Sequence, residues 1–156
     1  MTSISMDARA IWHEAAHSVV ALRFDFPAAD ILWENGNFKC THTGRPGISL
    51  RHVYIVLAAG AAAEELEFGG NYNPRGSSAD SASISKFGGA RIEDYLLEAT
   101  EILAARRQEL ESIVKELQKK WQGSIFTGRP NPFKVMSAEE IDAIHNSFLS
   151  QYAPAI

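Results

Sequence analysis

The sequence predicts an α+β fold that is mostly α-helical and carries one small β-hairpin or sheet. Long segments repeat apolar residues at steps of three and four, which is typical of helices with one buried face. One segment, residues 31–40, places an Asn-Gly pair between β-forming flanks, the strongest short-range signal of a hairpin. A length of 156 residues without internal repeats fits a single domain over residues 1–156.

The first two helices can be bounded from their end signals. Ser5 is expected to cap the first helix, whose Ala-rich run stops just before Pro27. A second helix is expected to begin near Ser49 and to end at Gly69, because glycine readily adopts the left-handed conformation that closes a helix. The small residues 58–63 within it predict close packing against another helix.

The second half of the chain is also predicted to be mainly helical. A turn-rich loop over residues 71–78 leads to a short helix that ends at the glycine pair 88–89. The clearest periodicity predicts one long helix over residues 92–121. A Pro-rich loop then leads to Ser137 and Glu140, whose spacing predicts a capping box that opens a final helix.

Charge and hydropathy weigh against several functional classes. The net charge of −4 leaves no surplus of basic side chains for nucleic acid. The longest apolar stretch, residues 53–63, is about half of what a membrane crossing requires, and residues 1–10 lack the features of a signal peptide. A lone cysteine, Cys40, fits a reducing compartment. We therefore expect a cytoplasmic protein that binds neither nucleic acid nor membranes.

The chemistry of the chain centres on an HExxH motif, His13-Glu14-Ala15-Ala16-His17. Two histidines four residues apart lie on one face of a helix, so both imidazoles can reach one zinc ion. Glu14 lies about 100° around the helix, where a carboxylate can act as the base for a zinc-activated water. Such a short motif also occurs by chance, so a third protein ligand is needed.

The order of three motifs resembles the peptidase domain of the FtsH-type ATP-dependent zinc proteases. This chain reads HEAAH at residues 13–17, GAAAEELEFG at residues 60–69 and GSSAD at residues 76–80. The resemblance implies a helical, zincin-like metallopeptidase fold with zinc as the cofactor. It further implies that Asp80 is the third zinc ligand beside His13 and His17, with Glu14 as the catalytic base.

The chain departs from this family at several positions. Ala16 replaces a glycine, Ala61 an arginine and Ala79 an asparagine. The printed sequence contains no G-x-x-x-x-G-K-[ST] phosphate-binding loop. Whether an ATPase partner or a homo-oligomer is needed therefore stays open. Glu64 and Glu65 have three possible roles: on a solvated helix face, as a metal ligand, or as the partner that orients a ligating histidine.

The sequence therefore predicts a zinc-dependent endopeptidase that acts on peptides or unfolded protein segments. The residues 31–42 could offer an edge strand to an extended substrate, or could simply cap the helical core. Two alternatives stay open for the whole chain. One is an inactive, metal-binding regulatory or adaptor domain that keeps the peptidase fold, and the other is a helical interaction module with a chance HExxH.

Overall fold

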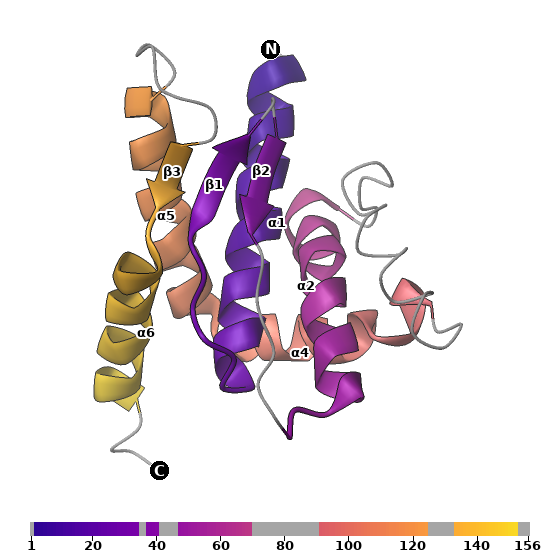
Figure 1. Cartoon of the computed structure of the whole chain (residues 1–156). Helices are drawn as coiled ribbons and strands as arrows, with labels where there is room; N and C mark the ends of the chain where they lie inside the picture. The colour runs from indigo at the N-terminus through magenta and orange to yellow at the C-terminus, as the bar shows by residue number, and fades with distance from the viewer. Residues whose placement is uncertain (1, 35–36, 41–46, 70–90, 125–132, 153–156) are drawn as a thin grey trace.

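The computed structural model describes residues 2–34, 37–40, 47–69, 91–124 and 133–152. It has a mostly helical α+β architecture, which confirms the predicted class. The described elements, in chain order, are α1 (Thr2–Arg23), β1 (Ile31–Glu34), β2 (Asn37–Cys40), α2 (Leu50–Phe68), the 3-10 helix η1 (Ile92–Asp94), α4 (Leu96–Ala105), α5 (Arg107–Ser124), β3 (Phe133–Met136) and α6 (Ala138–Tyr152) (Figure 1).

Helix α1 is the centre of the fold and contacts most of the other elements. The small sheet covers one of its sides, α2 packs beside it, and α4 crosses near its C-terminal end (Figure 1). The residues of α1 that face this core are small or β-branched and are fully buried: Ala15, Ala16, Val19, Val20 and Ala21. The run of small residues on α2 is buried as well, which confirms the predicted close packing of α2 against α1.

The ends of the first two helices follow local capping rules, with one correction. The hydroxyl of Ser49 accepts a hydrogen bond from the backbone N–H of Arg51, and Gly69 closes α2 with φ at +87°, as predicted. The predicted cap at Ser5 is wrong, because α1 already begins at Thr2. No glycine or proline interrupts the chain from Thr2 to Arg23, so the helix extends past Ser5.

The hairpin forms as predicted, and its sheet gains a third strand that was not predicted. β1 pairs antiparallel with β2, from Ile31 opposite Cys40 to Glu34 opposite Asn37, and the Asn-Gly pair itself lies outside the described residues. β3 pairs antiparallel with the other edge of β1, so the strand order is β2-β1-β3. β2 is therefore an edge strand of this sheet.

The prediction of one continuous helix over residues 92–121 is wrong. η1, α4 and α5 divide this segment, and Arg106 lies between α4 and α5 with φ −112° and ψ 30°. α4 packs on α2, whereas α5 packs on α1 and α6, so the chain changes direction at Arg106. The predicted apolar stripe is nevertheless mostly buried, with Leu103, Leu110, Ile113 and Leu117 fully so.

The final helix begins with the predicted capping box. The backbone N–H of Glu140 donates to the hydroxyl of Ser137 over 3.1 Å, and the backbone N–H of Ser137 donates to the carboxylate of Glu140 over 3.1 Å. The predicted short helix that ends at glycines 88–89 and the loop over residues 71–78 lie outside the described residues.

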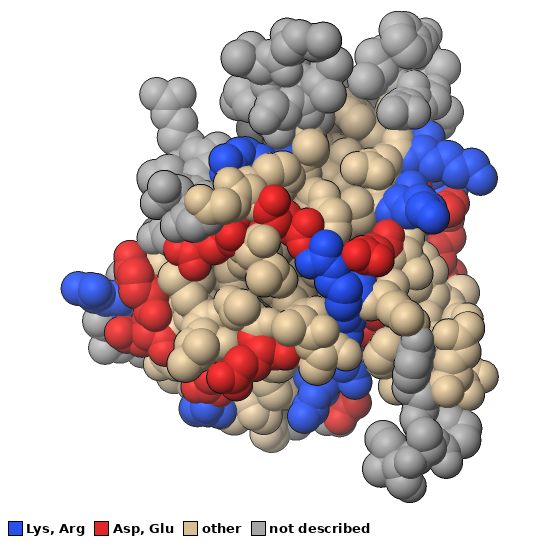
Figure 2. Space-filling view, turned by 180° about the vertical axis from the view of Figure 1, so that it is seen from behind, with Lys and Arg blue, Asp and Glu red and all other residues tan. Residues whose placement is uncertain are grey.

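The surface of the described part carries charges of both signs. Lys and Arg side chains are interspersed with Asp and Glu over the face seen in Figure 2. Several described charges form ion pairs, among them Arg107 with Glu67 and Lys120 with Glu140. None of the described helices is both long enough and apolar enough to cross a membrane.

Candidate functional site

The residues of the HExxH motif lie where α1 packs against α2. Arg9, His13 and His17 are spaced one turn apart on one face of α1. Their partners on α2 follow in the reverse order, because His17 contacts Val56 and His13 contacts Glu64, so the two helices run antiparallel at the site. Two neighbouring helices thus align the motif with a fixed set of partners.

The two imidazoles converge on each other within the protein. The Nε2 atoms of His13 and His17 are 3.1 Å apart, and the two rings meet edge to face at an interplanar angle of 75°. Their exposed fractions are only 5% and 6%. Both histidines are therefore held in one buried geometry rather than on a solvated helix face.

The opposite nitrogens of both rings have hydrogen-bond acceptors. Nδ1 of His17 lies 2.7 Å from the backbone carbonyl of Val56, and Nδ1 of His13 lies 2.9 Å from Oε2 of Glu64. A carbonyl or a carboxylate only accepts, so both Nδ1 atoms are assigned as donors. In neutral rings the two Nε2 lone pairs would face each other, and either a proton shared between the rings or a bound metal cation makes this approach favourable.

The distances fit a zinc ion as that cation. Two nitrogen ligands at about 2.0–2.1 Å from zinc in a tetrahedral site lie about 3.3 Å from each other. The observed separation of 3.1 Å between the Nε2 atoms is close to this value. Ligating histidines also commonly donate their other N–H to a carboxylate or a backbone carbonyl, which is the pattern here.

Gly60 provides the space that the His13 ring occupies. A Cβ atom at this position would lie 2.3 Å from Cε1 and 2.4 Å from Nε2 of His13, closer than any real contact. Gly60 lies one turn before Glu64 on α2. The absence of a side chain thus allows the imidazole to pack directly against the backbone of α2.

The adjacent glutamates Glu64 and Glu65 of α2 differ in their surroundings. Glu64 is 2% exposed and makes the contact with the far nitrogen of a histidine that was expected of one of the pair. The pKa of Glu65 is raised, chiefly because of partial burial and then because of the nearby charge of Glu93. Glu64 therefore contacts Nδ1 of His13, whereas Nε2 of the same ring faces His17.

The charge of Glu14 acts on Cys40 of the hairpin. The pKa of the Cys40 thiol is raised, chiefly by burial and next by the negative charge of Glu14, while a hydrogen bond from Ser18 lowers it. Cys40 is the last residue of the edge strand β2, which packs against α1. The charge of Glu14 thus acts on the thiol at the end of β2, and the raised pKa makes Cys40 a poor nucleophile.

The third predicted ligand, Asp80, lies outside the described residues. Within the described part of the chain, no aspartate, glutamate, histidine or cysteine joins His13 and His17 as a third metal ligand. The structure thus brings His13 and His17 together, and Glu14 follows His13 on the same helix. Sequence reasoning missed Arg9 and the Val56 carbonyl, although the i, i+4 spacing of Arg9 and His13 is a visible signal.

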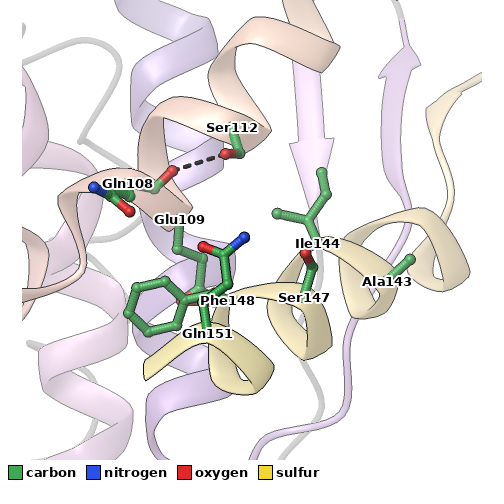
Figure 3. A pocket seen from close by; sticks show the side chains of 8 residues that line it. All are labelled: Gln108, Glu109, Ser112, Ala143, Ile144, Ser147, Phe148 and Gln151. Carbon is green, nitrogen blue, oxygen red and sulfur yellow. Dashed lines mark hydrogen bonds between the residues drawn. The ribbon is translucent and has the colours of Figure 1, made fainter. Parts of the chain in front are cut away.

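A separate groove of about 290 Å³ lies between α5 and α6 (Figure 3). The buried carboxylate of Glu109 lines it and is held by Nδ1 of His145 at 2.6 Å and by Arg106 at 3.3 Å. Both carboxylate oxygens thus have partners, and the His145 contact joins α6 to α5. This groove is lined by residues of these two helices alone and does not include the HExxH residues.

The chain matches no protein-family model and no curated protein, so a functional assignment depends on the geometry of the site.

Proposed function

We propose that this protein is a zinc-dependent endopeptidase, with His13, His17 and Asp80 as metal ligands and Glu14 as general base. The observation that carries the proposal is the 3.1 Å approach of two buried Nε2 atoms whose Nδ1 atoms both have acceptors. A hydrogen bond that shares one proton between the two Nε2 atoms is the alternative explanation of this contact, and zinc binding by the parent protein distinguishes the two. Asp80 enters through the resemblance of the GSSAD segment to the FtsH-type peptidases.

The roles of the chain's own residues follow from their chemistry. A bound zinc ion would activate a water molecule for attack on the scissile carbonyl and stabilise negative charge on the carbonyl oxygen. The carboxylate of Glu14 takes a proton from the attacking water as the new C–O bond forms. The same carboxyl group then gives this proton to the leaving amine nitrogen as the C–N bond breaks. The Nδ1–H groups of His13 and His17 donate to Glu64 and to the Val56 carbonyl and so keep the two rings in place.

The edge strand β2 supports a peptide as the substrate. Its outer side makes no ladder hydrogen bonds within the described sheet, since β1 pairs with the opposite side. An extended peptide can pair with such an edge through its backbone. β2 packs against α1, the helix that carries Glu14, so a peptide along this strand would lie on the same side of the molecule as part of that helix.

Glu14→Gln separates catalysis from metal binding. The variant should keep one zinc per chain and its helical content, and should lose cleavage of an unfolded protein substrate, because an amide cannot accept the proton. His13→Ala, His17→Ala and Asp80→Ala should lose zinc as well. Glu101→Gln, an exposed change on α4, is the matched control. Cleavage by Glu14→Gln at the parental rate would contradict the mechanism.

The alternative of a metal-binding adaptor predicts a different outcome for the parent protein. A parent that binds one zinc but cleaves no member of a diverse peptide library would favour the adaptor. The intact carboxylate of Glu14 between the two histidines of the motif favours the peptidase, because an adaptor needs no base.

A further inference from the structure

Arg9 contacts the carboxylate that holds His13. Nη1 of Arg9 lies 3.6 Å from Oε1 of Glu64, and the other oxygen of Glu64 lies 2.9 Å from Nδ1 of His13. Arg9 and His13 are one turn apart on α1, so Glu64 on α2 faces both of them. The two oxygens of a single carboxylate are thus divided between a guanidinium and an imidazole.

The guanidinium of Arg9 has a second contact that limits its movement. Its Cζ atom lies 4.9 Å from the centroid of the Phe68 ring, one turn beyond Glu64 on α2. A cation over an aromatic face is attracted by the ring, and this attraction is larger when the cation is partly desolvated. The Arg9 side chain is 29% exposed, so it is partly withdrawn from water.

A buried carboxylate has to be fixed in direction as well as compensated in charge. Glu64 is 2% exposed, where an ion needs close partners of opposite charge. Because Arg9 pairs with Oε1 of Glu64, rotation of the carboxylate away from His13 would break this ion pair. The other oxygen therefore stays directed at Nδ1 of His13, and this contact fixes the plane of the ring and the direction of its Nε2.

We propose that Arg9 is a positioning residue of the metal centre and acts through Glu64 to aim His13 at the metal. The inference rests on the zinc site proposed above. Loss of a residue that supports a ligating histidine typically lowers metal affinity by about 10–100-fold. Because Arg9 is one contact further away, the lower end of this range applies to it.

A double-mutant cycle on zinc affinity tests the proposal. The full chain is titrated with zinc against a competing chelator for the parent, Arg9→Ala, Glu64→Gln and the double variant. Arg9→Ala should weaken zinc binding about 10-fold. In the Glu64→Gln background the same change should have almost no further effect, because Arg9 acts through that carboxylate. Arg9→Lys should recover part of the affinity.

Arg23→Ala is the matched control, since Arg23 is on the same helix and lies over the ring of Phe24. It should leave zinc affinity unchanged. The imidazole Nδ1–H signal of His13 in the zinc-free protein gives a readout independent of activity. This signal should be visible by NMR in the parent and in Arg23→Ala, and broadened by exchange with water in Arg9→Ala.

Three results would overturn the proposal. An unchanged zinc affinity in Arg9→Ala would show that the guanidinium does not position the ligand. A 10-fold loss that persists in the Glu64→Gln background would show that Arg9 acts by another route. A parent protein that binds no zinc would remove the site itself, and this outcome is distinct from the other two because the parent alone reveals it.

Discussion

At the scale of single residues, the site depends on what surrounds the two histidines more than on the histidines alone. The Val56 carbonyl and the Glu64 carboxylate fix the Nδ1 atoms, and Gly60 leaves room for the His13 ring. The HExxH motif supplies spacing on one helix face. The neighbouring helix supplies the direction of each ring.

Gly60→Ala tests the importance of that space. In an open helix this change usually stabilises by about 1 kcal/mol, because alanine favours the helical backbone. Here the new Cβ would overlap the His13 ring, so we expect a net loss of about 1–3 kcal/mol in the free energy of unfolding. Denaturant unfolding of the variant measures its change in stability, and zinc titration measures its zinc affinity. A more stable variant with parental zinc affinity would refute this interpretation.

At the scale of elements, the sequence predicted what local rules control. The hairpin, the N-cap at Ser49, the stop at Gly69 and the capping box at Ser137 all form as expected, because each depends on a few adjacent residues. The contact of one α2 glutamate with a histidine was also anticipated. Whether Asp80 joins them stays a prediction, since it lies outside the described residues.

The missed features depend on contacts between distant segments. β3 is only four residues long and forms because the free edge of β1 is available, with Asp30 accepting from the backbone N–H of Ala138 over 2.8 Å. The break at Arg106 has no glycine or proline beside it, and the apolar stripe continues across it. Only the different packing partners of α4 and α5 reveal the change of direction.

Glu140, at the start of α6, should make the stability of the fold depend on pH. The pKa of Glu140 is lowered, chiefly by its hydrogen bond with Lys120 and also by hydrogen bonds from Ser137. A lowered folded-state pKa stabilises the fold above the ordinary value of 4.5. This contribution is lost as the pH falls from 4.5 through the lower folded-state pKa.

Glu140→Gln is the variant that measures this contribution. The side chain is 38% exposed, so the difference from the parent at pH 7 should be at most about 1 kcal/mol. It should shrink steadily below pH 4.5, as followed by thermal unfolding in a pH series. Glu139→Gln, next to it but exposed, is the control. A difference that grows on acidification would have the wrong sign for this account.

At the scale of the whole molecule, the proposed metal site lies within a fold that apolar packing already stabilises. α1 and α2 meet through buried Ala, Val and Ile side chains, and α5 and α6 enclose the other side of α1. The described core is continuous around the site rather than organised by it. This arrangement differs from small zinc-dependent domains that unfold without their metal.

Removal of zinc should therefore abolish cleavage while the helices stay folded. After treatment with a strong chelator, we expect circular dichroism near the parental spectrum and a lower Tm, because ligand binding to the native state stabilises it. Zinc added back should restore cleavage. Global unfolding of the metal-free protein at 25 °C would show that apolar packing alone does not stabilise the fold.

The most direct test of the central claim is X-ray absorption at the zinc edge of the purified protein, with the metal content measured on the same sample. The account predicts one zinc per chain with two imidazole nitrogens at about 2.0–2.1 Å and oxygen ligands completing the site. One imidazole should disappear from the spectrum in His17→Ala, if any zinc remains. A metal-free parent, or zinc bound without two imidazoles, would contradict the account.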